Sequence, residues 1–366
     1  MKRIAIIGRG AHTLPTYRAM LNKFTEHYPL VLYSEVVMKP EWLSAPHSYT
    51  IRSVSHDNYP RRIRDFMLLL MIIRDHWRNP YALIHAHSTY PSGMIGIVLR
   101  KLFKIPVLVC LDGAEGSALP SIHFGDLLSK RRARLNQWVI NQADAVTALT
   151  HFQRDEVYRN LPIRKHISVI PRGVEMPEHN PLLQERTNSP VTILSIGYLS
   201  PVKDPITLIH TFYAIQKETD CHLIHIGEDY MNGEVQLLTK KLGIEDKVSF
   251  KGHLPYRQVK IFLERAHLFL LTSVYESQAM VVVEAMAMGI PVCGTHVGIM
   301  ADLSGSCCIT MPPGESSALA HEVIALFKNK ERMDTLRKNG YAWARQNDLN
   351  KCVDATLKIY SSLIKG

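Results

Sequence analysis

Short apolar runs without polar alternation recur along the first half of the chain, and they end at turns. Three of them are Arg3–Ile7, Leu83–His87 and Pro106–Leu111. An uninterrupted apolar run predicts a strand covered on both faces, and the longer amphipathic stretches between the runs predict crossover helices. The pattern therefore predicts an α/β domain with a doubly wound parallel sheet over residues 1–175.

The pattern stops at residues 176–190, which contain three prolines and little periodicity and which we interpret as a linker. It then restarts in a second series of apolar runs: Val191–Ile196, His222–Ile226, Lys247–Lys251, Leu268–Thr272 and Ile290–Gly294. Helical stretches lie between them, for example at Asp204–Glu218 and Asn232–Leu242. These features predict a second Rossmann-like domain over residues 191–347.

A last amphipathic stretch over residues 348–366 predicts a terminal helix, which we expect to pack back onto the first domain. Two doubly wound domains leave a cleft between them. Open α/β sheets bind ligands at the carboxyl ends of their strands. The residues that follow the strands are therefore the first place to search for a site.

Composition excludes several classes of protein. The chain has 366 residues, of which 46% are hydrophobic and 21% charged, so it is neither a disordered chain nor a collagen-like or disulfide-scaffold protein. Six scattered cysteines in apolar surroundings predict buried, reduced thiols. The longest apolar run, Phe66–Ile73, is far shorter than the roughly 20 residues that span a bilayer. The apolar run before Gly8 is too short for the core of a signal peptide. We expect a cytoplasmic protein.

The net charge of +10 belongs to the first half of the chain. Residues 1–175 carry 24 Lys and Arg against 13 Asp and Glu, whereas residues 176–366 carry 19 against 20. A basic surface favours phosphates, nucleic acid or an acidic membrane leaflet. No nucleic-acid motif accompanies it, so nucleic acid is not expected as a partner. Arg61–Asn79, an apolar run with cationic flanks, is either a membrane-surface segment or a core crossover helix, and Ser129–Arg134 adds four more cations.

The segment Leu268–Gly294 holds the most informative polar residues. It predicts a buried strand, a polar loop over Ser273–Gln278 and a helix over Ala279–Met288 that stops at Gly289. Glu276 lies in the loop and Glu284 among apolar helix residues, where an ionised carboxylate needs hydrogen-bond partners such as ligand hydroxyls. The alternative is a helix-start charge and a surface residue.

The start of that helix is a second candidate feature. The backbone N–H groups there, with the positive end of the helix dipole, suit a phosphate; the residues are Gln278, Ala279 and Met280. The only other glycine turn of interest, Gly8 and Gly10, does not complete a G-x-G-x-x-G motif, and it is either a tight strand-to-helix turn or a phosphate loop.

The segment ESQAMVVVEAMAMGIPV, from Glu276 to Val292, resembles the ES-x-G-x-V-x-x-EAMA-x-G-x-PV pattern of retaining GT-B glycosyltransferases of family 4. Further stretches match that family in the same order: LIHAH at Leu83–His87, VIPRGVE at Val169–Glu175, SIGYLSPVKDPITLI at Ser195–Ile209, HLIHIGE at His222–Glu228 and VSFKGHL at Val248–Leu254. The resemblance implies two Rossmann-like domains facing each other across a cleft. It implies transfer of a sugar from a nucleotide-diphosphate donor to a polysaccharide or lipid-linked acceptor, with retention of anomeric configuration.

The resemblance also implies roles for single residues. Glu284 would hold the donor ribose and Glu276 the hydroxyls of the donor sugar. Lys203 and the amides at the helix start would neutralise the departing diphosphate, which has a physical basis because charge develops there as the bond breaks. The neighbouring donor-binding candidates are Gly197, Tyr198 and Arg172. A solvated loop lysine remains the alternative interpretation of Lys203.

No two aspartates are separated by one residue, so the metal-binding motif of the other glycosyltransferase fold class is missing and we expect neither a metal nor a cofactor. The chain also departs from the family. Tyr198 replaces an arginine of the family, and Arg172 is a candidate to supply the missing positive charge. Ala279 replaces a glycine. The segment His296–Asp302 lacks the family's paired glycines and acidic residue. The family histidine in the first domain is missing, and candidates for its role are Asp112, which we rank first, Glu115 and His123.

These departures keep alternatives open. One is a sugar-nucleotide 2-epimerase of the same fold, and another is a catalytically silent partner subunit. His85 and His87 match the family and are either cleft-facing or core histidines. If the first half is the acceptor domain, its positive charge points to an acceptor that is anionic or that is held at an anionic membrane surface, where the protein would be peripheral.

Overall fold

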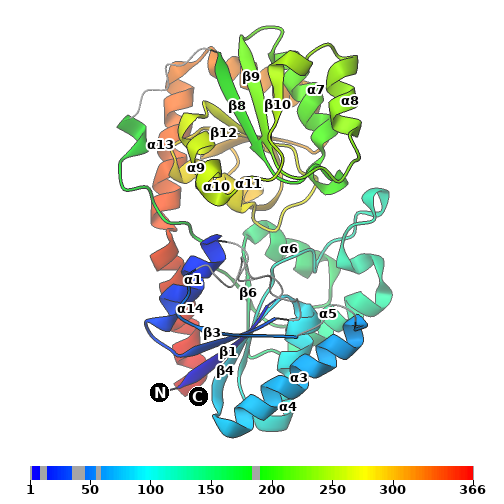
Figure 1. Cartoon of the computed structure of the whole chain (residues 1–366), viewed down its shortest axis with the longest axis vertical. Helices are drawn as coiled ribbons and strands as arrows, with labels where there is room; N and C mark the ends of the chain where they lie inside the picture. The colour runs from blue at the N-terminus through cyan, green and yellow to red at the C-terminus, as the bar shows by residue number, and fades with distance from the viewer. Residues whose placement is uncertain (1, 9–14, 35–45, 55–58, 184–189, 366) are drawn as a thin grey trace. The chain divides into compact units, whose positions relative to one another are not determined.

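The computed structural model describes residues 2–8, 15–34, 46–54, 59–183 and 190–365. It divides the chain into two compact units (Figure 1). The N-terminal unit comprises Met1–Pro171 together with Leu349–Gly366, and the C-terminal unit comprises Arg172–Asp348. The terminal helix α14, Leu349–Lys365, thus belongs to the N-terminal unit.

The N-terminal unit is built on a seven-stranded sheet with the order β3-β2-β1-β4-β5-β6-β7. All of its paired strands run parallel. The strands are β1 (Arg3–Ile7), β2 (Leu30–Ser34), β3 (Thr50–Ser53), β4 (Tyr81–His87), β5 (Val107–Cys110), β6 (Ala145–Ala148) and β7 (Ile167–Val169). Parallel neighbours need crossovers, and helices supply them.

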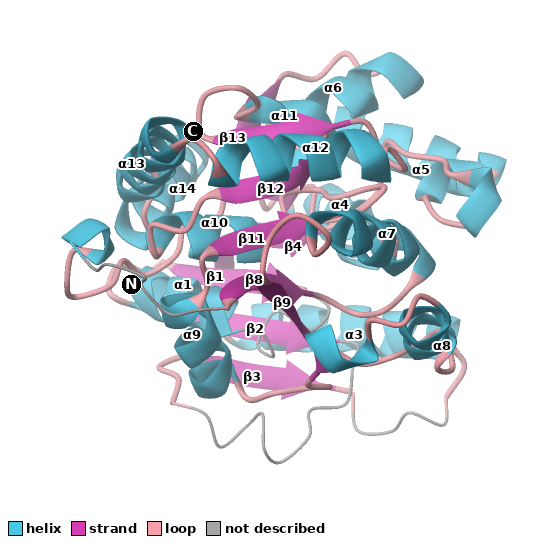
Figure 2. Cartoon of the chain, turned by 90° about the horizontal axis from the view of Figure 1, so that it is seen from above, coloured by secondary structure: helices cyan, strands magenta, loops and turns pink. Residues whose placement is uncertain are grey.

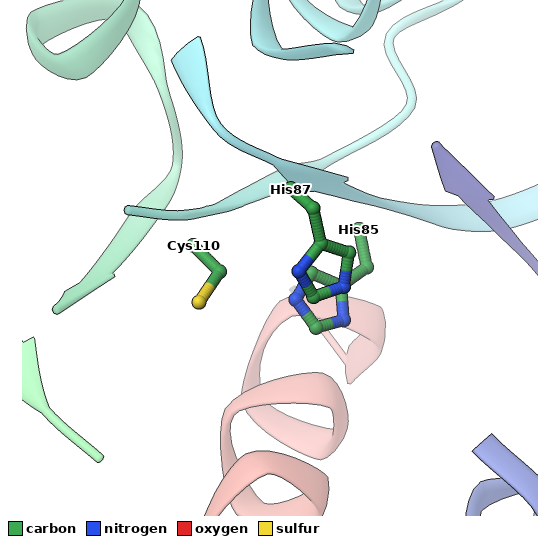
Figure 3. Close-up of side chains that lie close together, drawn as sticks. All are labelled: His85, His87 and Cys110. Atoms are coloured by element: carbon green, nitrogen blue, oxygen red, sulfur yellow. The ribbon is translucent and has the colours of Figure 1, made fainter. Parts of the chain in front are cut away.

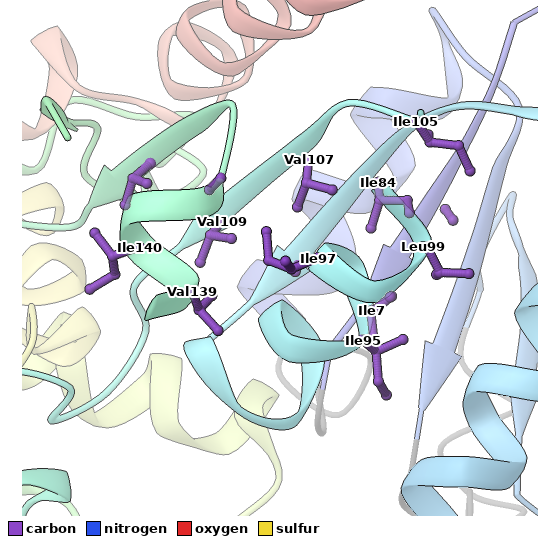
Figure 4. Close-up of a cluster of buried hydrophobic side chains, with 14 of the residues drawn as sticks. Ile7, Ile84, Ile95, Ile97, Leu99, Ile105, Val107, Val109, Val139 and Ile140 are labelled. Atoms are coloured by element: carbon purple, nitrogen blue, oxygen red, sulfur yellow. The ribbon is translucent and has the colours of Figure 1, made fainter. Parts of the chain in front are cut away.

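Helices cover both faces of this sheet because successive strand residues point to opposite sides. On β1, Ala5 and Ile7 join a core with α3, α4 and α5 (Figure 4), whereas Ile4 and Ile6 join one with α1 and α14. The helices are α1 (Pro15–Thr25), α3 (Arg61–Arg78), α4 (Met94–Phe103), α5 (Lys130–Gln142) and α6 (His151–Asn160), with short turns at η1 (Thr89–Gly93), η2 (Pro120–Ile122) and η3 (Asp126–Leu128).

The C-terminal unit has a second parallel sheet with the order β10-β9-β8-β11-β12-β13, which Figure 2 shows from β13 to β9. The strands are β8 (Val191–Ile196), β9 (Cys221–Ile226), β10 (Val248–Phe250), β11 (Leu268–Leu271), β12 (Val292–Thr295) and β13 (Cys308–Met311). The helices are α7 (Pro205–Ile215), α8 (Glu234–Lys241), α9 (Tyr256–Arg265), α10 (Met280–Ala287), α11 (Gly298–Asp302), α12 (Ser316–Phe327) and α13 (Lys330–Gln346), with turns at η4 (Pro181–Leu183), η5 (Pro201–Lys203) and η6 (Glu245–Lys247).

The predicted α/β class and its two Rossmann-like sheets are confirmed. The strands predicted from apolar runs are all present, most with ends shifted by one or two residues. Gly8 continues β1 through a hydrogen bond from its N–H to the Tyr33 carbonyl, whereas Gly10 lies outside the described residues. All six cysteines are buried and form no disulfide, as predicted. In the described part of the chain, no helix combines the length and the apolarity that crossing a membrane requires.

Candidate functional site

The strand order of the C-terminal sheet reverses direction at β8. One half of the sheet extends from β8 through β9, and the other half through β11. Such a switch point, at the carboxyl ends of the strands, is where open parallel sheets bind ligands. The loops after β8 and β11 occupy this position, and they carry most of the predicted donor residues.

The loop after β8 fixes the position of Lys203. The Thr272 hydroxyl at the end of β11 donates to the carbonyl oxygens of Lys203 and Asp204, at 3.2 and 3.0 Å. The Asp204 side chain then caps α7 by accepting a hydrogen bond from the Thr207 N–H at 3.1 Å. The lysine stem lies along the open face of Gly197, with its carbons 3.7 Å or more from where a Cβ would stand. The backbone at Lys203 is therefore held by two neighbouring elements.

Lys203 and Glu276 form an ion pair, with Nζ 2.5 Å from Oε1. The same carboxylate oxygen accepts a hydrogen bond from the Ser273 hydroxyl at 2.7 Å. Glu276 is buried, whereas the Lys203 side chain keeps about 30% of its surface exposed. The arrangement presents an ammonium group at the carboxyl edge and orients a carboxylate beside it, which suits an anion and a hydroxyl group respectively.

Gln278 is buried, and its side chain is committed to structure. Its Oε1 accepts from the Arg172 N–H at 2.9 Å, and its Nε2 donates to the Arg172 carbonyl at 2.8 Å. The Gln278 carbonyl in turn accepts from the Ile299 N–H at 3.0 Å at the start of α11. Gln278 thus links three segments. In both of its hydrogen bonds with Arg172, its side chain contacts the backbone and not the guanidinium group.

Helix α10 begins one residue later than predicted, because Ala279 adopts a left-handed conformation with φ of +72°. No side chain caps this helix start. The left-handed region costs an alanine about 1–2 kcal/mol, which a glycine would avoid. Met280 is the first helical residue, so of the three predicted amides those of Ala279 and Met280 flank the helix boundary, and that of Gln278 lies one residue before it.

Glu284 lies on α10 in a buried position. The Tyr256 hydroxyl donates to its Oε1 at 3.0 Å. Burial raises the pKa of Glu284 to about 7, although the Tyr256 hydrogen bond and nearby Lys260 act to lower it. With these residues Glu284 lines a cavity of about 780 Å³ between α9, α10 and the Val174–Pro181 segment. The predicted carboxylate is thus accessible from a cavity within the C-terminal unit.

Two exposed tyrosines mark the ends of β8 and β9. Tyr198 packs edge-on against Tyr230, with ring centroids 5.2 Å apart, and the Tyr230 hydroxyl donates to Glu228 at 2.6 Å. The strand ends meet closely beneath them, because a Cβ at Gly227 would overlap the Gly197 carbonyl oxygen. Tyr198 therefore presents an aromatic face where the family pattern has a cation.

In the N-terminal unit, Asp112 follows β5 and pairs with the end of the adjacent strand β4. His87 Nδ1 lies 2.9 Å from Asp112 Oδ2, and the Cys110 thiol donates to Asp112 Oδ1 at 3.1 Å. The Tyr17 hydroxyl contacts the other ring nitrogen of His87. The result is a hydrogen-bonded network at the carboxyl edge, with Asp112 as its most exposed side chain.

Glu115 supports the turn that carries Asp112. It is buried, and its carboxylate accepts hydrogen bonds from the N–H groups of Asp112 and Gly113 at 3.2 and 3.0 Å. Burial raises the pKa of Glu115 to about 7. His123, the other predicted substitute for the family histidine, lies at the end of η2 and is exposed. Of the three candidates, Asp112 alone is bonded to a histidine at the ends of the central strands.

His85, His87 and Cys110 are the one group in the described residues whose ligand atoms are clustered closely enough to suggest a metal, within 4.8 Å of one another (Figure 3). The two histidine rings point toward α14. Hydrogen bonds already engage both nitrogens of His87, and the His85 ring bonds the Tyr360 hydroxyl at 2.6 Å. These groups therefore fit a protein hydrogen-bond network better than a metal site.

The structure brings the predicted donor residues into three groups, all within the C-terminal unit. Lys203 meets Glu276, Gln278 meets Arg172, and Glu284 faces a separate cavity. Sequence reasoning missed Ser273 and Tyr256, which bond the two glutamates, and it missed His87 as the partner of Asp112. The last pair was within reach, because His87 and Asp112 end two consecutive predicted strands.

Two family profiles match the chain. The one described as "Glycosyltransferase Family 4" covers residues 24–178, and the one described as "Glycosyl transferases group 1" covers residues 183–343. Together they span most of both units.

Two curated relatives are similar over most of their length. The N-acetyl-alpha-D-glucosaminyl L-malate synthase of Bacillus anthracis is 25% identical over 299 residues, covering 78% of this chain and 75% of that protein. The putative teichuronic acid biosynthesis glycosyltransferase TuaC of Bacillus subtilis is 27% identical over 281 residues, covering 74% and 67%.

Solved structures share the fold. Anabaena Alr3699/HepE in complex with UDP and glucose superposes with a TM-score of 0.78 at 18% identity, covering 99% of this chain and 100% of that one. A sucrose-phosphate synthase from Thermosynechococcus elongatus superposes with a TM-score of 0.80 at 18% identity, covering all of both chains.

Proposed function

This chain belongs to glycosyltransferase family 4, and we propose from that premise that it moves a sugar from a nucleotide-diphosphate donor to a saccharide or lipid-linked acceptor with retention of anomeric configuration. The observation that carries the proposal is the Lys203–Glu276 pair at the switch point of the C-terminal sheet. A cation beside an oriented carboxylate is what a charged leaving group and a sugar ring require. The relative solved with UDP and glucose supports a nucleotide sugar as donor.

In this proposal Lys203 acts on the leaving group. Glycosyl transfer passes through an oxocarbenium-like state while a negatively charged diphosphate departs. When a donor is bound, the Lys203 ammonium turns from Glu276 to the diphosphate oxygens and neutralises the developing charge. The amides at Gln278, Ala279 and Met280 add hydrogen bonds to the same oxygens, so that no metal is needed.

Glu276 and Glu284 take the hydroxyl groups of the donor. Glu276, held by the Ser273 hydroxyl, accepts hydrogen bonds from the sugar ring. Glu284 accepts from the ribose, and its bond with Tyr256 holds the carboxyl group in place before the donor arrives. Gly197 leaves room for the phosphates, while Tyr198 and Arg172, which both depart from the family motif, complete the donor side.

The acceptor side is assigned to the N-terminal unit. Asp112 is proposed to orient the acceptor hydroxyl, and His87 keeps the Asp112 carboxylate in one position. Asp112 therefore takes the place of the histidine that the family has in this unit. The basic N-terminal unit suits an anionic acceptor, or one held at the cytoplasmic face of an anionic membrane, with the protein bound peripherally.

A panel of nucleotide sugars tested by thermal shift identifies the donor, and NMR of the products then defines the reaction. We expect one donor to raise the melting temperature and to be consumed by the wild-type protein and not by Glu276→Ala. Retention appears as an α-linked product from an α-linked donor. Isomerisation of the donor without any acceptor would identify an epimerase, and a chain that binds no nucleotide sugar at millimolar concentration would identify a silent subunit; either result contradicts the proposal.

A further inference from the structure

Helix α3 has one face in the core and one face exposed to solvent. Its inner face packs into the core of the N-terminal unit through the buried Leu68 and Ile72. Its outer face nevertheless carries large apolar side chains at helical spacing. Their exposed fractions are 45% for Ile63, 57% for Phe66, 47% for Leu70 and 73% for Trp77. Exposed apolar side chains arranged in one stripe mark an interaction site.

The charges of α3 are sorted between the same two faces. Both of its acids point inward: Asp65 accepts from the Tyr90 hydroxyl at 2.9 Å, and Asp75 accepts from the Tyr33 hydroxyl at 2.7 Å. The exposed charges of the helix are all arginines, at positions Arg61, Arg62, Arg74 and Arg78. The outer face of α3 thus combines apolar bulk with positive charge and carries no acid.

The cationic surface continues beyond α3. The Tyr90 ring lies against both the Arg61 and the Arg132 guanidinium groups, 5.0 and 4.0 Å from its centroid. Arg132 belongs to α5, whose first turns expose further cations at Lys130, Arg131 and Arg134. The two basic segments of the sequence therefore meet at Tyr90, on the face of the sheet that α3, α4 and α5 cover (Figure 1).

We infer that the outer face of α3, with the start of α5, is a docking surface for an anionic lipid bilayer. Arginines and a tryptophan around an apolar stripe match the interface of a bilayer, where aromatic rings lie at headgroup level and guanidinium groups reach the phosphates. Both acids of α3 lie on its inner face, and Asp126, beside the start of α5, is paired with Arg132. The outer face of α3 therefore favours a surface of uniform negative charge over a protein of mixed charge. This deepens the proposed peripheral membrane location but requires neither donor nor acceptor to be bound.

Sedimentation with vesicles tests the inference on the full chain. Phosphatidylcholine vesicles are compared with vesicles that also contain phosphatidylglycerol, at low and high salt. We expect binding to the anionic vesicles only, weakened by salt, since each cation near an anionic surface contributes about fivefold in affinity. Trp77 emission should shift to the blue on binding, and Trp77→Phe should remove that shift.

Two sets of variants locate the surface. Phe66→Ser with Leu70→Ser removes apolar bulk, and Arg74→Glu with Arg78→Glu reverses charge; each should reduce vesicle binding at least tenfold. The matched control is Leu237→Ser with Lys240→Glu on α8, where an apolar residue and a cation are equally exposed but lie in the other unit. All variants should keep the wild-type circular dichroism and UDP affinity, because the changed residues are exposed.

Three outcomes overturn the inference. They are no sedimentation with anionic vesicles at low salt, unchanged binding by the α3 variants, and an equal loss in the α8 control. A fourth outcome, self-association of the chain that the α3 variants abolish, would also overturn it and would assign this face to a second copy. Failure of vesicle binding leaves donor turnover intact, whereas failure of the proposed transferase leaves vesicle binding intact, so the two can be told apart.

Discussion

The carboxyl edges of the two sheets hold different chemistry. In the C-terminal unit a lysine, Lys203, faces a carboxylate that is fixed by Ser273. In the N-terminal unit the groups linked through His87 and Asp112 are a carboxylate, an imidazole, a thiol and a phenol. The first edge suits a charged phosphate group and the second suits a neutral hydroxyl group.

This contrast changes the meaning of the charge asymmetry. The N-terminal half holds all of the surplus positive charge, yet its cations are prominent on the outer faces of α3 and α5. The near-neutral C-terminal half supplies the lysine at its sheet edge. In the proposals above, the clustered charge therefore binds a large anionic surface, whereas the single placed lysine binds a small anion.

The largest effect on catalysis is expected from removing the Lys203 cation at the carboxyl edge of the C-terminal sheet. Lys203→Met should lower kcat by about 10²–10³, because the diphosphate then departs without a neutralising cation. Steady-state kinetics with the identified donor measure this. Lys241→Met, at an exposed position on α8, is the control and should be neutral. Full turnover by Lys203→Met would remove the lysine from the mechanism.

Breaking the N-terminal edge should affect transfer and spare the donor. Asp112→Asn should slow transfer by about a hundredfold, through misplacement of the acceptor hydroxyl, and leave the affinity for UDP unchanged. Asp155→Asn, an exposed aspartate on α6, serves as the control. Weakened UDP binding by Asp112→Asn would show that the two edges do not divide the substrates in this way.

The two edges also differ in how tightly their backbones pack. Gly227→Ala should cost about 3 kcal/mol or more in the free energy of unfolding, because its Cβ would overlap the Gly197 carbonyl oxygen. Gly113→Ala meets the Glu115 carboxylate only at 3.8 Å, an ordinary contact, and should change stability by about 0.5 kcal/mol or less. Denaturant unfolding compares them, and equal losses would contradict the packing described for β8 and β9.

Glu284→Gln should make stability less dependent on pH. Burial raises the pKa of Glu284 from 4.5 to about 7, so the wild-type carboxyl group contributes stability below pH 4.5 that is lost as the pH rises through 7. Glutamine does not ionise. The variant should therefore gain about 2 kcal/mol over the wild type between pH 5 and pH 8, read as melting temperatures. A difference that does not grow with pH would show that Glu284 ionises normally.

The smallest effect concerns the start of α10. Ala279→Gly should relieve the left-handed backbone strain at φ of +72°, offset in part by the greater freedom of glycine in the unfolded chain. We expect a gain of up to about 1 kcal/mol by chemical denaturation. A loss of stability would mean that the alanine methyl group packs favourably enough to offset the strain.

Much of the fold follows from local sequence. Buried strands such as β8 and β11 have no polar alternation, so the sequence predicts that they exist. Where each strand ends depends on its hydrogen bonds to neighbouring strands. The helices α7, α8 and α14 follow from the amphipathic periodicity of their sequences. The sequence could not predict that the side chains of Asp65 and Asp75 point inward. Their hydrogen-bond partners, Tyr90 and Tyr33, are distant in sequence.

The candidate site could be predicted from the sequence less completely than the fold. The motif identified Glu276 and Glu284 through resemblance, but the pairing of Glu276 with Lys203 joins residues 73 positions apart. The bond between the Gln278 side chain and the Arg172 backbone, 106 positions apart, has no local signal. The left-handed Ala279 was hidden because alanine normally favours helix, and only the family's glycine at that position hinted at it.

The central claim is that the donor diphosphate binds at the C-terminal edge and that the N-terminal edge takes no part in holding it. Calorimetric titration of UDP into the wild type, Lys203→Met and Asp112→Asn tests it most directly. We predict at least a tenfold loss of affinity in Lys203→Met and the wild-type affinity in Asp112→Asn. Undiminished UDP binding by Lys203→Met, or an equal loss in both variants, would contradict the account.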